Sequence, residues 1–129
     1  MRLLNEYEKT EAVALLDKGT WTHTLTISSY GDDVTAGKIY LQVTEGLQRL
    51  LHNDPSAEFV FYVCRNGQGR IHAHGVISTT LKHIRIQGCF RGGWAKIFAS
   101  QPNIYGWYEY IAKQALAETL ITNPQESFV

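Results

Sequence analysis

Two histidines, His72 and His74, are separated by a single alanine in the apolar run that extends from Arg70 to Ile77. Alternate residues of a β-strand point to the same face of the sheet, so a strand here places both imidazoles side by side. Imidazole nitrogens are common ligands of divalent metal ions. The spacing therefore predicts half of a metal site, which residues from elsewhere in the fold must complete.

A tyrosine, Tyr110, lies in a segment with helical periodicity that opens at Pro102. The predicted core face of this helix is the stripe formed by Ile104, Tyr108, Ile111 and Ala115. Tyr110 lies on the flank of that stripe, where it either packs over its neighbours or reaches out from the sheet-facing side of the helix. Lys113 lies just beyond this flank.

The charges sum to zero, but they are unevenly divided along the chain. Residues 1–58 hold nine acidic and five basic residues, whereas residues 59–108 hold no acidic residue. The basic residues of the second segment are Arg65, Arg70, Lys82, Arg85, Arg91 and Lys96. Lysines and arginines that neutralise phosphates release counterions, so such a segment suits a polyanion. These charges either converge on one surface or lie scattered, and Arg70, Arg91 and Lys96 are the predicted phosphate contacts.

The length of 129 residues predicts one domain over residues 1–129, too short to include a helicase motor. No apolar run approaches the roughly 20 residues that cross a bilayer, and the start lacks the pattern of a leader peptide. Cys64 and Cys89 form no CxxC pair and are too few for a disulfide scaffold. We expect a soluble protein in the cytoplasm of the host cell, without a membrane partner.

The chain has the pattern of an α+β fold with a central antiparallel β-sheet and flanking helices. We expect helices at residues 3–17, 35–52 and 102–119, and strands at residues 20–28, 58–65, 70–79 and 94–99. Residues 81–88 fit either a strand or a short helix. The glycine turn after Arg65 joins two of the strands as a hairpin, which places the histidine pair in the middle of the sheet.

In chain order, three motifs resemble those of the HUH endonucleases, in particular the initiators that nick single-stranded origins in rolling-circle replication. The matching runs are Thr22-His23-Thr24-Leu25-Thr26, Ile71-His72-Ala73-His74-Gly75-Val76-Ile77 and Tyr110-Ile111-Ala112-Lys113. They are similar to the family's first strand motif, its histidine-hydrophobic-histidine motif and its Tyr-x-x-Lys helix. The tyrosine follows the histidines, as in initiators and single-strand transposases, and does not precede them as in conjugative relaxases.

The resemblance implies a ferredoxin-like fold and an enzyme that nicks and rejoins single-stranded DNA at an origin or hairpin of a plasmid or virus. Tyr110 would attack the phosphodiester and leave a 5′-phosphotyrosine. Mg²⁺ or Mn²⁺ on His72 and His74 would polarise the phosphate, and Lys113 would steady the developing charge. A separate helicase and the host polymerase would be its partners.

The third metal ligand is where the chain departs from the family's pattern. Related initiators supply a glutamate or another polar ligand from the strand before the histidines, but here that strand ends with Cys64 and no carboxylate. Gln114 is the first choice, because it resembles the ligand that some single-strand transposases place one turn past their tyrosine. Glu58 and Glu109 are the alternatives. Cys64 would favour a softer metal such as zinc.

Further residues suit an unpaired strand, because bases stack on aromatic rings. The aromatic residues near the basic segment are Trp21, Trp94, Tyr105, Trp107 and Tyr108. Most of them will be core residues. His23, on the first predicted strand, either contacts DNA beside the site or packs within the sheet.

Other functional classes fit the sequence less well. The histidine triad hydrolases have a third alternating histidine where this chain has Val76, and the two-histidine phosphoesterases need a second His-x-Thr motif. A single-strand transposase remains an alternative. So does a non-catalytic nucleic-acid-binding module in which His72 and His74 only pack or touch phosphate.

Overall fold

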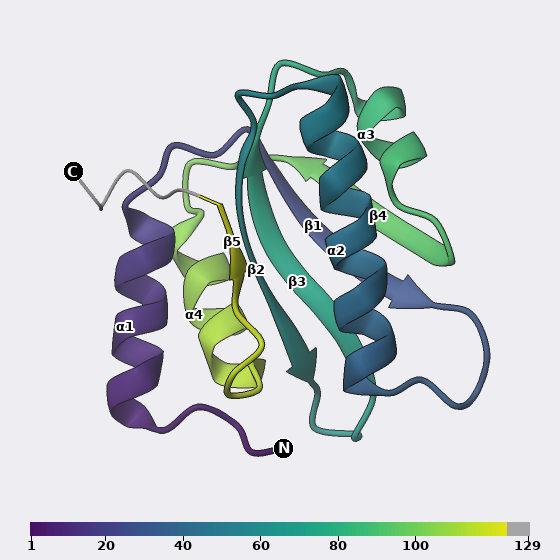
Figure 1. The fold of residues 1–129 in the computed structure, drawn as a ribbon. Coiled ribbons are helices and arrows are strands. Elements are labelled where there is room, and N and C mark those ends of the chain that lie inside the picture. The colour runs from purple at the N-terminus through teal and green to yellow at the C-terminus, as the bar shows by residue number, and fades with distance from the viewer. Residues whose placement is uncertain (124–129) are drawn as a thin grey trace.

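The computed structural model describes residues 1–123, which form a five-stranded antiparallel sheet with helices on both faces (Figure 1). The helices are α1 (Glu6–Asp17), α2 (Ala36–Asn53), α3 (His83–Cys89) and α4 (Tyr105–Gln114). The strands are β1 (His23–Ser29), β2 (Glu58–Arg65), β3 (Ile71–Ser78), β4 (Gly93–Ala99) and β5 (Ile121–Thr122). The strand order is β4-β1-β3-β2-β5. The predicted α+β fold with a central antiparallel sheet is confirmed, and β1-α2-β2-β3-α3-β4 follow the ferredoxin-like βαββαβ order.

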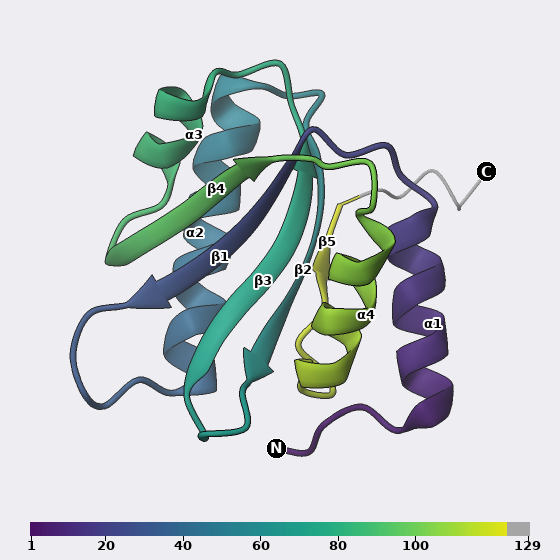
Figure 2. The ribbon, with the colours of Figure 1, turned by 180° about the vertical axis from the view of Figure 1, so that it is seen from behind.

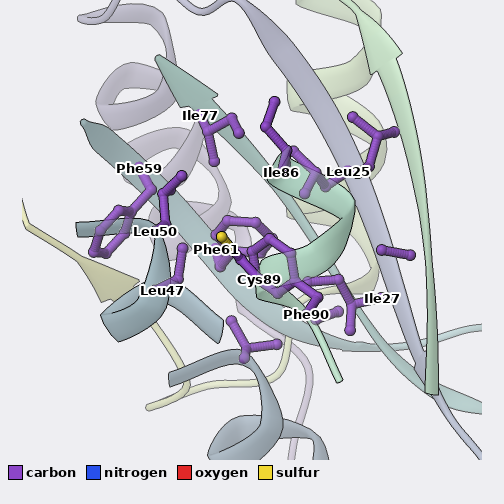
Figure 3. Packing of buried hydrophobic residues seen from close by; sticks show 14 of the residues in the cluster. Leu25, Ile27, Leu47, Leu50, Phe59, Phe61, Ile77, Ile86, Cys89 and Phe90 are labelled. Atoms are coloured by element: carbon purple, nitrogen blue, oxygen red, sulfur yellow. The ribbon is translucent and has the colours of Figure 1, made fainter. Parts of the chain in front are cut away.

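One face of the sheet is covered by α2 and α3 (Figure 1). The main hydrophobic core lies between these layers and includes Leu25, Ile27, Leu47, Leu50, Phe59, Phe61, Ile77 and Ile86 (Figure 3). The odd-numbered residues of β3, Ala73 and Ile77, belong to this core. Because side chains alternate along a strand, His72 and His74 point to the opposite face. The buried pattern of β3 thus fixes the direction of the histidine pair.

The second face is only partly covered, by α1 and α4. Its core is made by Leu16, Val60, Tyr62, Val76, Tyr108 and Ile111, which come from these two helices and from β2 and β3. Figure 2 shows α4 and α1 on the side of β2, whereas β1 and β4 have no helix over them on this face. The predicted core stripe of α4 is confirmed, since Tyr108 and Ile111 are buried. The histidines therefore lie close to the border between covered and open sheet.

The hairpin between β2 and β3 has the antiparallel form that the sequence predicts. His74 pairs with Tyr62, and His72 pairs with Cys64. The turn is held by Asn66, whose Oδ1 accepts hydrogen bonds from the backbone N–H groups of Gln68 and Arg70 at 2.9 and 3.0 Å. This turn brings Arg70 to the end of β3 that carries the histidines.

The last helix is shorter than predicted, because α4 covers only the middle of residues 102–119. Ala115 leaves the helix with an extended backbone and forms a bridge with Cys64. The backbone N–H of Leu116 donates to the Val63 carbonyl at 2.9 Å, and β5 then pairs with β2. The run after α4 has good helix formers, but the free edge of β2 offers hydrogen-bond partners that local propensity does not reveal.

Two other segments clarify the predicted element boundaries: residues 3–5 differ from the prediction, and residues 81–88 resolve an open alternative. Residues 3–5 do not join α1, because the side chain of Asn5 caps the helix and the N–H of Leu4 donates to the Ala115 carbonyl at 3.1 Å. Residues 81–88, left open between strand and helix, contribute to α3. Within residues 1–123, no helix is both long and apolar enough to span a membrane.

We expect Asp54 to make the stability of the fold depend on pH. Its carboxylate accepts hydrogen bonds from Thr79 Oγ1 at 2.6 Å and Ser56 Oγ at 2.7 Å, which join the end of α2 to the loop after β3. These hydrogen bonds lower the pKa of Asp54 to about 2, and the one from Thr79 contributes more than the one from Ser56. A lowered carboxylate pKa stabilises the fold above the unfolded value of about 3.9, and this contribution is lost as the pH falls toward 2.

Asp54→Asn should therefore reduce the free energy of unfolding by roughly 1 kcal/mol at pH 6. The difference in this free energy between the variant and the wild type should shrink as the pH falls from about 4 to about 2. Urea unfolding at a series of pH values measures this difference. Glu45→Gln, which changes an exposed carboxylate of α2, is the matched control. A difference that stays constant down to pH 2 contradicts the expectation.

Candidate active site

The histidine pair and Gln114 form one cluster between β3 and α4. The Nε2 atoms of His72 and His74 are 2.8 Å apart, and Oε1 of Gln114 is 3.3 Å from Nε2 of His72. His74 is only 4% exposed. The structure thus brings together the three residues that the sequence analysis ranks first as metal ligands.

The two imidazoles are uncharged at neutral pH. Burial lowers the pKa of His74 to about 3, with a further lowering by neighbouring His72. Burial also lowers the pKa of His72. Hydrogen bonding to the Gln114 amide oxygen, which accepts from a protonated imidazole, raises the pKa of both residues, but burial outweighs it. Neutral imidazoles have a free lone pair, which is the form that binds a metal ion.

The spacing of these three groups fits a divalent ion. Two ligands at right angles on an ion with bonds of about 2.1 Å lie about 3.0 Å apart. The separations of 2.8 and 3.3 Å in the cluster are close to that value. Two imidazoles and an amide oxygen form a mixed nitrogen and oxygen set, which suits ions such as Mn²⁺ or Mg²⁺ in an open coordination site.

Thr26 of β1 supports His74 at the ring nitrogen that is turned away from His72. Its Oγ1 is 2.9 Å from Nδ1 of His74, and the two residues pair directly in the sheet. A hydrogen bond at Nδ1 orients the ring and leaves the lone pair of Nε2 for the metal. Thr26 lies in a strand motif of the sequence but has no predicted role, because the pairing of β1 with β3 is not visible in either segment alone.

Tyr110 lies beside the histidine pair. Its ring centroid is 5.3 Å from that of His74, and the ring stacks on Trp107 with a centroid distance of 5.5 Å and an interplanar angle of 17°. Nε1 of Trp107 donates to the carbonyl of Gly75 at 3.2 Å, which ties this part of α4 to β3. Tyr110 is 44% exposed, so its side chain is accessible from solvent.

A groove of about 940 Å³ extends from the histidines and Tyr110 across the open face of the sheet. Its walls are the loop after β1, the hairpin turn and the start of β4. Arg70 and Lys96 line it, together with one acidic residue, Asp32. Two of the three predicted phosphate contacts therefore share a groove with the candidate site.

The other candidate ligands lie away from the pair. Glu58 pairs with Ser78, four residues along β2 from Tyr62, the partner of His74, which corresponds to about 13 Å. Glu109 and Lys113 line the surface between α1 and α4, on the far flank of Tyr110. Lys113 is an exposed cation one turn from Tyr110 and has no place in the cluster.

Cys64 lies on the same face as its partner His72 but is fully buried. Burial raises the pKa of the Cys64 thiol to about 12, so the metal-binding thiolate form is disfavoured. Across residues 1–123, no three His, Cys, Asp or Glu side chains gather in a metal-binding group. The candidate third ligand next to the histidine pair is instead the side-chain amide of Gln114.

His23 and Arg91 lie away from the candidate site. His23 shares the face of β1 that packs on α2, where burial and then the charge of His83 in α3 lower its pKa. Arg91 lines a surface cavity of about 550 Å³ between α2 and α3, together with Arg49 and Arg85. The basic segment is thus divided between two faces, and His23 and Arg91 are removed from the set of site contacts.

We expect Gln114→Ala to weaken Mn²⁺ binding by about 10- to 100-fold, because it removes the oxygen beside Nε2 of His72. Titration calorimetry with Mn²⁺ measures the change. Glu109→Ala, on the other flank of the same helix, is the control and should leave the affinity unchanged. Equal affinities for wild-type protein and Gln114→Ala would remove Gln114 from the site.

Comparisons with known proteins give a likeness of fold. No family model matches the chain, and no curated protein matches it. Among solved structures, the chain is similar to the hypothetical protein ORF119 from Sulfolobus islandicus rod-shaped virus 1, with a TM-score of 0.52 and 19% sequence identity. The match covers 81% of this chain and 91% of that protein. At this identity, the likeness extends to the architecture of the sheet and helices alone.

Proposed function

We propose that this protein is a metal-dependent endonuclease that nicks and rejoins single-stranded DNA through a covalent bond to Tyr110. The observation that carries the proposal is the position of Tyr110 beside the pair of His72 and His74, in one groove with Arg70 and Lys96. A nucleophile, a candidate site for a divalent ion and two phosphate-binding cations are the parts that strand transfer needs.

In the proposed reaction the hydroxyl oxygen of Tyr110 attacks the phosphorus of the scissile phosphodiester. The bond from tyrosine oxygen to phosphorus forms, the bond from phosphorus to the 3′-oxygen breaks, and the proton lost by the phenol balances the one gained by the 3′-hydroxyl. The 5′-phosphate stays on Tyr110. Because the new ester conserves the bond energy, attack by a 3′-hydroxyl reverses the step and rejoins a strand.

The side chains of the cluster divide the remaining tasks. His72, His74 and Gln114 would hold a divalent ion, whose chemistry is to polarise a nonbridging phosphate oxygen. Thr26 keeps the His74 ring oriented, and Trp107 supports the ring of Tyr110 by stacking. Water remains able to reach Tyr110, which fits a site that accepts a long polymer.

The proposed biological setting is the start of rolling-circle replication of a plasmid or virus, with a separate helicase and the host polymerase as partners. The order of the three motifs and the Tyr-x-x-Lys helix support this setting. The setting predicts a preferred nick position on an origin strand or hairpin.

The test is a covalent adduct. Wild-type protein is incubated with Mn²⁺ and a pool of end-labelled single-stranded oligonucleotides, then separated on a denaturing gel. The proposal expects a labelled band at the mass of protein plus DNA, which EDTA prevents and which peptide mass spectrometry maps to Tyr110. Binding of the oligonucleotides without cleavage at any Mn²⁺ concentration would refute it and favour a non-catalytic binding module.

A further inference from the structure

The half of the sheet that α1 and α4 leave open has a distinctive surface. On β4, residues 94, 96 and 98 point to this face, and they are Trp94, Lys96 and Phe98. Trp94 is 49% exposed and Phe98 is 62% exposed. Figure 2 shows β4 and β1 side by side with no helix over them. Two large apolar rings thus lie exposed on one side of an edge strand, with the cation of Lys96 between them. Such exposed apolar rings mark an interaction surface.

We propose that this face is the path of the single-stranded DNA, with one base stacked on Trp94, another stacked on Phe98 and a phosphate at Lys96 between them. This inference rests on the proposed function and names its substrate contacts. Unpaired bases stack on aromatic side chains, while a basic groove tracks the backbone, and this combination is typical of single-strand recognition.

The path is continuous with the candidate active site. Lys96 pairs with Thr26 on β1, and Thr26 pairs with His74 on β3, so the three residues form one row across the sheet. Two strand spacings separate Lys96 from His74, which is roughly 10 Å. A phosphate at the histidine cluster and a phosphate at Lys96 can therefore belong to one strand that crosses the open face.

The two rings have different surroundings. Phe98 borders a cavity of about 490 Å³ between the end of β4 and the start of α4, with Gln101, Asn103 and Trp107 among its other walls. Amide side chains can donate to and accept from a base edge, so this recess suits a base that is read as well as stacked. Trp107 and Thr26 line both this cavity and the groove of the active site, which makes the two spaces neighbours.

Trp94 is in ring contact with Tyr30, from the loop after β1. Their ring centroids are 5.3 Å apart with an interplanar angle of 49°, and Tyr30 is also exposed. Because both rings are exposed, a base can lie against either of them. Trp94 also lines the groove that holds Arg70 and Lys96, so a base here keeps its phosphates near positive charge.

The distance between the rings favours an unpaired, extended strand over a duplex. Trp94 and Phe98 are four residues apart on one strand, which is about 13 Å. Stacked bases in a helix are spaced by about 3.4 Å along each strand, and their faces are not open to side chains. Two bases that stack on these two rings must therefore be separated from each other.

The test measures binding in the absence of Mn²⁺, which makes it independent of cleavage. Fluorescence anisotropy follows a labelled 15-nucleotide thymidine strand and a 15-nucleotide strand of abasic sites, which has the phosphates but no bases. Trp94→Ala and Phe98→Ala should each weaken binding of the thymidine strand by roughly 5- to 100-fold and leave the abasic strand unaffected. The double variant should give the product of the two factors, because the sites are well separated.

The controls separate stacking from charge and from folding. Lys96→Ala should weaken both strands alike, and Tyr40→Ala, an exposed aromatic on α2, should weaken neither. If Trp94→Ala and Phe98→Ala weaken both strands equally, or if the wild type binds neither strand, the DNA path is refuted. Sedimentation shows the competing occupant: a dimer that Phe98→Ala converts to a monomer, with unchanged DNA affinity, would assign this face to a second copy.

This inference and the proposed function can fail separately. A Tyr110 adduct together with unchanged thymidine binding in Trp94→Ala and Phe98→Ala would refute the DNA path and leave the endonuclease intact. The stated loss of thymidine binding with no adduct under any metal condition would leave a single-strand binding face and refute the nuclease.

Discussion

Tyr110→Phe is expected to abolish the covalent adduct and to lower single-strand cleavage by at least about a thousand-fold, because the variant lacks the attacking oxygen. The phenyl ring can keep its stack on Trp107 and its contact with His74, so the fold and the metal cluster should survive. Affinity for single-stranded DNA should stay within about threefold of the wild type, since the proposed DNA contacts of Trp94, Lys96 and Phe98 do not involve the Tyr110 hydroxyl. Denaturing gels and anisotropy measure the two quantities on the same protein.

The same helix provides the matched controls. Tyr105 is 51% exposed and Tyr108 is buried, and burial raises the pKa of the Tyr108 hydroxyl. Neither is in ring contact with the histidines, and Tyr105→Phe should retain full adduct formation. An adduct that persists in Tyr110→Phe but disappears in Tyr105→Phe would move the nucleophile to Tyr105 and overturn the assignment.

Replacement of either histidine is expected to have the second large effect. His72→Ala and His74→Ala each remove one of two nitrogens that are 2.8 Å apart, so the affinity for Mn²⁺ should fall by more than about 100-fold. Cleavage at a fixed, limiting Mn²⁺ concentration should fall with it. Calorimetric titration and cleavage assays on the two variants measure these losses.

Folding must be separated from metal binding in these variants. His74 is buried and hydrogen-bonded to Thr26, so His74→Ala should also lower the free energy of unfolding, by about 1 to 3 kcal/mol. His72 is more exposed, and His72→Ala should lose the metal with a smaller loss of stability, as urea unfolding would show. His52→Ala, at the end of α2, is the control for a histidine outside the site. Unchanged Mn²⁺ affinity in both site variants would refute the metal centre.

Much of the fold and the centre of the site could be predicted because they depend on local patterns. The alternation of His72 and His74 with buried residues sets their common direction, and the glycine turn sets the hairpin. The position of Gln114 follows from helical periodicity relative to Tyr110. These are relations within one element, and periodicity alone is enough to express them.

What could not be predicted depends on how separate elements pair. The strand motif of β1 does not say that Thr26 pairs with His74 or that His23 points to the opposite face. The charge pattern does not show that Arg91, in the loop after α3, lies away from the groove. The exposure of Phe98 could not be predicted, because it depends on which strands α4 leaves uncovered. Strand order and helix placement are properties of the assembled sheet.

The way α4 is fastened has a mechanical consequence. Near the start of α4, the indole N–H of Trp107 donates a hydrogen bond to the carbonyl of Gly75 in β3. Just past the end of α4, the backbone N–H of Leu116 donates a hydrogen bond to the carbonyl of Val63 in β2. If a DNA strand is covalently held at Tyr110, as we propose, these hydrogen bonds help to hold its point of attachment on the sheet, together with the packing of α4 against α1 and β2. In the proposed reaction, the helix that bears the phosphotyrosine would therefore stay anchored to the sheet at both ends while the ester is stored.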